Sequence, residues 1–259
     1  MAVSSASETG LIAPIADALL SKSYLEIWRG NPLATLTAAE ALEIVAREHG
    51  MMQHVNEAEL HSGWARGRTH DSESGAAEVR RVLTAFVEQG VRVNLALYTG
   101  LLAELEAETL GAESALARID EALRLSNEVG HGCSLPFLHR LRGHILLKRQ
   151  PADAAQAEEA FRTSIAIAKE QSARSPVLLA SLALAKLYQA TGRPAEAHAV
   201  LAPALDAMLS LLPFGRKPVP SEAREAGDEG FAGRDEGLVP SPPAPCMIFS
   251  VPNQLKRSG

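Results

Sequence analysis

The chain has 259 residues and a formal net charge of -6, and it is 46% apolar but only 4% aromatic. Such a core is built from Ala and Leu, which suit helices packed through small residues, whereas sheets favour β-branched and aromatic side chains. No stripe of Lys and Arg with interleaved aromatics is present, which excludes a typical nucleic-acid-binding surface, and no apolar run reaches the roughly 18 residues that a membrane helix needs. We therefore expect an all-α protein that binds neither nucleic acid nor membrane.

The two cysteines, Cys133 and Cys246, lie far apart in the sequence, so a disulfide framework or a zinc site is not expected. The N-terminal run MAVSSASETG lacks the basic segment of a secretion signal. Both features favour a cytoplasmic protein.

The first predicted helix covers residues 11–29 and ends at the turn RGNP. Residues 1–31 are therefore interpreted as the N-terminal helix of a first hairpin, and whether that hairpin is truncated stays open. Thr37 and Glu40 have the spacing of a capping box, which predicts that the second helix begins at Thr37 and ends near Gly50.

Two further hairpins follow. In the weaker one, helices at about 53–66 and 75–88 flank the polar turn RGRTHDSESG. The next pairs VNLALYTGLLAELEAETL with ESALARIDEALRLSNEVG, and glycines at positions 111 and 130 punctuate it.

The clearest repeat lies between Leu138 and Leu205, which hold two copies of one pattern about forty residues apart. In each copy an apolar helix, a turn rich in Gly, Pro or Asp, and a second helix with small residues on one face follow one another. Neither helix can bury its apolar face alone, so neighbouring hairpins must cover it. The sequence thus predicts an α-solenoid of about five tetratricopeptide-like hairpins over residues 32–213.

One small residue in each second helix aligns the repeats. The equivalent positions are interpreted as Ala34, Glu78, Ala115, Ala157 and Ala197, which are 44, 37, 42 and 40 residues apart. These spacings are looser than the 34 residues of a standard tetratricopeptide repeat. The second unit, with Glu where Ala is expected, is interpreted as degenerate.

The composition changes after Pro213. Residues 214–259 hold seven of the 15 prolines and six of the 19 glycines and show no apolar period. Such a segment buries too little surface to offset its ordering entropy, so we expect a disordered tail.

The runs EALRLSNEVG, LHRLRGHILL, AEEAFRTSIAIAKEQSARS and LLASLALAKLYQATGRPAEAHAVLAPAL resemble the C-terminal tetratricopeptide-like region of large bacterial signalling proteins. The resemblance covers about residues 32–212. In those proteins a nucleotide-cyclase or DNA-binding output domain precedes an ATPase domain, and the repeats follow. This chain lacks a G-x4-G-K-[ST] phosphate loop and any cyclase or helix-turn-helix segment, so the resemblance implies a repeat module separated from its output domains, without ATP hydrolysis or cyclic-nucleotide synthesis.

The tetratricopeptide frame also predicts a binding groove. It places His139, Arg142 and Arg149 on one helix face beside Lys186 and Gln189 of the next repeat. This face is basic on an acidic chain and would suit the carboxylates of a protein or peptide partner. Two alternatives stay open: the cations are ordinary solvated residues, or Gly143 shifts the frame by a residue or two and dismantles the cluster.

Other candidates are weaker. His54, Glu57 and His61 share a helix face, but they lack the H-E-x-x-H spacing of a zinc site. Cys133 precedes a helix without an identifiable catalytic partner and is interpreted as a structural thiol, and Trp28 and Trp64 as packing residues. We therefore expect a non-enzymatic interaction module without cofactors. The alternatives are a regulatory segment of a signalling ATPase or cyclase system and, with no motif to support it, a metal- or thiol-dependent enzyme.

Overall fold

The computed structural model describes residues 12–130, 132–150 and 154–210, and every regular element in these ranges is a helix, which confirms the predicted all-α class. The predicted tail at 214–259 lies outside the described residues. The elements, in chain order, are α2 (Ile12–Arg29), α3 (Pro32–Glu48), α4 (Met52–Thr69), α5 (Ser72–Glu88), α6 (Leu95–Thr109), α7 (Ala112–Val129), the short 3-10 helix η1 (Gly132–Ser134), α8 (Leu135–Arg149), α9 (Ala155–Glu170), α10 (Arg174–Ala190) and α11 (Pro194–Leu209).

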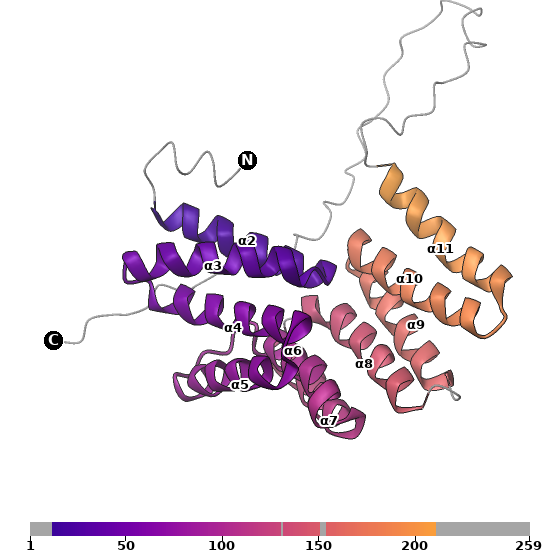
Figure 1. Cartoon of the computed structure of the whole chain (residues 1–259). Coiled ribbons are helices and arrows are strands. Elements are labelled where there is room, and N and C mark those ends of the chain that lie inside the picture. The colour runs from indigo at the N-terminus through magenta and orange to yellow at the C-terminus, as the bar shows by residue number, and fades with distance from the viewer. Residues whose placement is uncertain (1–11, 131, 151–153, 211–259) are drawn as a thin grey trace, which may run out of the picture. The chain divides into compact units, whose positions relative to one another are not determined.

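The helices form consecutive hairpins within a compact unit that ends at Met208. We call α2, α4, α6, α8 and α10 the first helices and α3, α5, α7, α9 and α11 the second helices of five hairpins. From α2 to α10, each helix packs against the next (Figure 1). Each first helix also packs against the first helix of the following hairpin. Side chains on successive first helices can therefore share one surface.

The first turn shows how the helices end and begin. Gly30 has a φ of 71°, a conformation that L side chains rarely adopt, and its N–H donates to the carbonyl of Ile27. Asn31 then caps α3 by accepting from the N–H of Ala34, and Pro32 occupies the first turn. The predicted start of this helix at Thr37 is therefore wrong, and the Thr37 hydroxyl instead donates to the Leu33 carbonyl inside the helix.

The small residues that align the repeats sit near the start of every second helix. The structure buries Thr35, Gly75, Ala115, Ala157 and Ala197 there, each at the third or fourth position of its helix. Their spacings are 40, 40, 42 and 40 residues. The period is thus more regular than the sequence alignment indicated.

Two positions of the predicted alignment need correction. Ala34 lies one residue before the buried Thr35, and Glu78 lies three residues after Gly75. Glu78 instead accepts two hydrogen bonds from Nη2 of Arg66 on α4, at 2.8 and 2.7 Å. The second hairpin is therefore not degenerate, because glycine fills the place of alanine.

A buried carboxylate joins the second hairpin to the third. Glu106 of α6 is fully buried and accepts from Nη2 of Arg80 on α5 at 2.9 Å and from Nε of Arg118 on α7 at 2.5 Å. Breaking a buried ion pair by removing one partner costs several kcal/mol, because the other charge is left without compensation. Glu106 thus requires both arginines in place.

The backbones of α4 and α5 approach most closely at their glycines. A Cβ added to Gly75 would lie 2.4 Å from Cα and 2.7 Å from N of Gly67, and 2.6 Å from O of Gly63. These are backbone atoms of a packed helix, so they cannot move aside as the end of a side chain can. Only glycine fits at position 75.

We expect Gly75→Ala to destabilise the protein by about 2 kcal/mol or more, because the clash outweighs the roughly 1 kcal/mol that alanine gains over glycine in helix propensity. Chemical denaturation monitored by circular dichroism would measure the change. The matched control is Ser74→Ala, at the exposed neighbouring residue. Equal stabilities for the two variants would contradict the close approach.

Candidate functional site

Charged side chains of successive first helices are tied together. On α6, Glu104 accepts from Nη1 of Arg68 at 2.7 Å and from Nε1 of Trp64 at 2.9 Å, both on α4. Further along α6, Glu108 pairs with Lys148 of α8. Three first helices thus contribute to one polar surface.

His144 of α8 shows that this surface is mainly positive. The pKa of its imidazole falls to about 4, first because the ring is buried and then because Arg140, Arg68, Lys186 and Lys148 all lie near it. Lys186 belongs to α10, so a fourth first helix contributes to this polar surface. We call Arg68, Arg140, His144, Lys148 and Lys186 the basic face.

Two cations of the basic face form no direct ion pair in the described helices, although the charge of Glu104 lies near enough to act on Arg140. Arg68 and Lys148 are neutralised by Glu104 and Glu108, but neither Arg140 nor Lys186 forms an ion pair within the described residues. Arg140 lies over the ring of Phe137, 5.4 Å from its centroid, and Lys186 is exposed. These two side chains can therefore attract an external anion.

The five residues predicted from the sequence do not form one face. Arg142 pairs with Asp120 at 3.4 Å and Arg149 with Glu113 at 3.6 Å, and both acids belong to α7. His139 is half-buried, and burial and the charge of Arg142 lower its pKa. Lys186 and Gln189 are exposed on α10, and of the five only Lys186 belongs to the basic face.

The correction follows from how α8 is rotated. A Cβ on Gly143 would lie 2.4 Å from Cε1 of Phe161, so this side of α8 packs directly on α9. That contact turns Arg142 toward α7 and places Arg140 and His144 near Lys186. The structure thus groups Arg140 and His144 with Lys186. A signal was present in the sequence, since Arg140, His144 and Lys148 recur every fourth residue.

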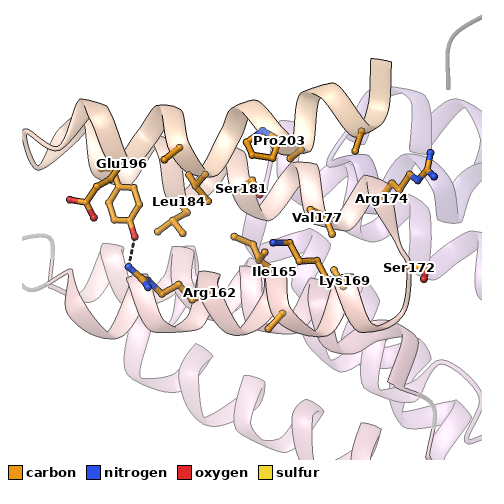
Figure 2. Close-up of a pocket in the computed structure, with 17 residues that line it drawn as sticks. Arg162, Ile165, Lys169, Ser172, Arg174, Val177, Ser181, Leu184, Glu196 and Pro203 are labelled. Atoms are coloured by element: carbon orange, nitrogen blue, oxygen red, sulfur yellow. Dashed lines mark hydrogen bonds between the residues drawn. The ribbon is translucent and has the colours of Figure 1, made fainter. Parts of the chain in front are cut away.

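A separate groove lies along the second helices at the end of the array. It has a volume of about 840 Å³ and runs between α9 and α11 with α10 at its floor (Figure 2). Its walls are mainly apolar, as with Ile165 and Leu184, and Lys169 and Arg174 lie on its rim. Sequence reasoning did not predict this groove.

One end of this groove is fixed by Glu158 of α9. This carboxylate accepts from Nη1 of Arg193 at 2.6 Å, from the Tyr188 hydroxyl at 2.9 Å and from Nη2 of Arg162 at 2.7 Å. The hydrogen bonds, led by that from Arg193, lower the pKa of Glu158 to about 2. The charged groups at this end of the groove, Glu158, Arg162 and Arg193, pair with one another. This end is therefore less able to bind a ligand than the basic face.

A buried polar cluster joins the first three hairpins. Glu57 of α4 accepts from the hydroxyl of Tyr98 at 3.2 Å and from that of Tyr24 at 3.4 Å. Asn94 donates to the Tyr24 oxygen at 2.8 Å. Burial raises the pKa of Glu57 above its ordinary value.

The sequence placed His54, Glu57 and His61 on one helix face, and in the structure their hydrogen bonds go to different residues. His61 is fully buried, with Nδ1 2.8 Å from Oγ of Ser23 and Nε2 without a partner in the described residues. His54 faces Asp17 at 3.1 Å. No group of three metal-binding side chains is found in residues 12–130, 132–150 and 154–210. His54, Glu57 and His61 each hydrogen-bond to a different partner.

Comparison with known proteins adds little. No family model matches the chain. An uncharacterized protein of Rhizobium meliloti is 28% identical over 149 residues, which are 57% of this chain. The aligned part is only 14% of that relative's length. Among the described helices, none is long and apolar enough to cross a membrane.

The buried His61 should make stability depend on pH. Burial lowers the pKa of its imidazole from 6.5 to about 3, so below pH 6.5 the unfolded chain binds a proton that the folded chain excludes. Stability from this group is present above pH 6.5 and is lost as the pH falls toward 3. The loss between pH 7 and pH 5 is about 2 kcal/mol.

Denaturant titrations of wild type and His61→Asn at several pH values would test this. Asparagine does not titrate, so we expect the free energy of unfolding to fall less steeply for the variant. The raised pKa of Glu57 acts in the opposite direction, with stability lost as the pH rises through it, but it is common to both proteins. Parallel pH profiles would show that His61 can be protonated in the folded state.

Proposed function

We propose that this chain is a cytoplasmic, non-enzymatic interaction module whose basic face binds an acidic segment of a protein or peptide. The observation that carries the proposal is that Arg140 and Lys186 form no direct ion pair in the described residues, on a surface shared by four first helices. A chain with a net charge of -6 has no general excess of cations, so this concentration is local.

The geometry supports an extended ligand. Successive first helices lie beside one another, so their side chains offer contacts to several residues of a partner. A carboxylate gains two hydrogen bonds from a guanidinium and one strong charge from an ammonium group. Because the face already contains Glu104 and Glu108, a partner with regularly spaced acids fits better than a highly charged polyanion.

The alternative is a regulatory segment of a bacterial signalling system with a separate ATPase or nucleotide cyclase. It is favoured by the length of the Rhizobium relative, since the aligned part is only 14% of that much longer chain. An ATPase or cyclase reading frame beside this gene, and copurification of its product with this chain, would support the alternative.

The proposal predicts that Lys186→Glu weakens binding of an acidic peptide by about tenfold or more, because an attraction becomes a repulsion. Fluorescence anisotropy with labelled decapeptides, in which Glu alternates with Ser or Ala, would measure affinity at two salt concentrations. Wild-type binding should weaken at the higher salt, since charges near the surface are screened within about 10 Å at 0.1 M. Stability should hardly change, because Lys186 is exposed.

The matched control is Arg142→Glu, which reverses a charge on the side of α8 that faces α7. We expect its affinity to stay within about twofold of wild type at moderate salt. If Lys186→Glu and wild type bind the peptides equally, the basic face is an ordinary solvated surface. The groove between α9 and α11 would then be the next surface to test.

A further inference from the structure

A small pocket lies where the end of α2 meets the starts of α8 and α10. Its volume is about 100 Å³, and it is more enclosed than the groove between α9 and α11. It is lined by Leu25 and Trp28 of α2, Phe137 and Arg140 of α8, Pro176 and Leu179 of α10, Cys133 of η1 and other residues of these helices. The pocket therefore joins the first hairpin to the fourth and fifth.

The polar groups around this pocket are positive or donating. Two arginines, Arg29 and Arg140, line it, and no carboxylate does. Arg29 is paired with Glu26, but Arg140 forms no ion pair within the described residues. Phe137 and Pro176 lie in the first turns of α8 and α10, the ends at which the dipole of a helix is positive. The pocket is suited to a negative group.

Trp28 supplies an independent indication of a missing acceptor. Its Nε1 atom is buried and has no hydrogen-bond partner in the described part of the chain. A buried indole N–H without an acceptor is unfavourable, and tryptophan normally finds one. An oxygen of a bound ligand would satisfy it.

The remaining walls limit what can enter. Leu25, Phe137, Pro176 and Leu179 are apolar, so a strongly hydrated ion such as inorganic phosphate would lose water without compensation. A cavity of about 150 Å³ holds one benzene ring, so this pocket, at about 100 Å³, takes a smaller body. The ligand needs one anionic group and a compact apolar remainder.

We propose that this pocket binds a small aliphatic monocarboxylic acid of about the size of isobutyrate, with the carboxylate at Arg140 and Nε1 of Trp28. The inference does not rest on the proposed peptide binding, because the acid enters the pocket itself and Lys186 does not line it. A bound acid would hold the first hairpin against the fourth and fifth. Binding should therefore also raise the unfolding temperature of the protein.

Isothermal titration calorimetry of the full chain with sodium isobutyrate would test the site, with isobutyramide as its neutral isostere. We expect a dissociation constant below about 1 mM for isobutyrate and at least about tenfold weaker binding of isobutyramide. Arg140→Gln and Trp28→Phe should each weaken binding of that acid about tenfold. Trp28→Phe should leave the unfolding temperature of the empty protein unchanged or higher, since it removes a donor that has no acceptor.

Arg142→Gln is the control on the same helix, and Lys186→Glu separates this site from the peptide surface. Both should bind the acid within about twofold of wild type, because neither residue lines the pocket. Circular dichroism melts would confirm that each variant is folded. The proposal is overturned if isobutyrate does not bind at about 10 mM, if isobutyramide binds as well as isobutyrate, or if folded Arg140→Gln and Trp28→Phe both retain wild-type affinity.

Discussion

The close approach of paired helices through small residues is the constraint on which the other contacts depend. At Gly75 the distance leaves no room for a Cβ, and Ala115 and Ala157 are fully buried at the equivalent positions of α7 and α9. Only at such distances can hydrogen bonds such as that from Arg118 to Glu106 span a hairpin. A core poor in aromatics is stable here because backbones, rather than large side chains, fill the space.

The fold could be predicted from the sequence because each hairpin repeats an apolar period and a turn. The exact register could not, since an alignment based on alanine overlooks Gly75, which the sequence alone places at the edge of a polar turn. The rotation of α8 was harder still. One residue turns a helix face by about 100°, and the contact of Gly143 with Phe161 that fixes this rotation joins different helices. The ion pair of Arg142 with α7, which removes Arg142 from the predicted face, likewise cannot be predicted from the neighbouring sequence.

Buried polar groups are concentrated in the first three hairpins, where Glu57, His61 and Glu106 are each fixed by neighbours on other helices. From the fourth hairpin onward, the hydrophobic core is continuous through α11. Such polar contacts tolerate few alternative packings, because each misplacement leaves a donor or acceptor unsatisfied. We infer that they specify the order in which the N-terminal hairpins stack, whereas apolar burial holds the C-terminal ones.

The pocket at Trp28 affects how the array of hairpins should respond to local unfolding. In a strictly linear stack each hairpin contacts only its neighbours, so unfolding spreads inward from a terminus, one hairpin after another. Here residues of the first hairpin also line a pocket together with residues of the fourth and fifth, so α2 has neighbours beyond the second hairpin. The amide protons of α2 should therefore exchange more slowly than those at the end of an open stack would.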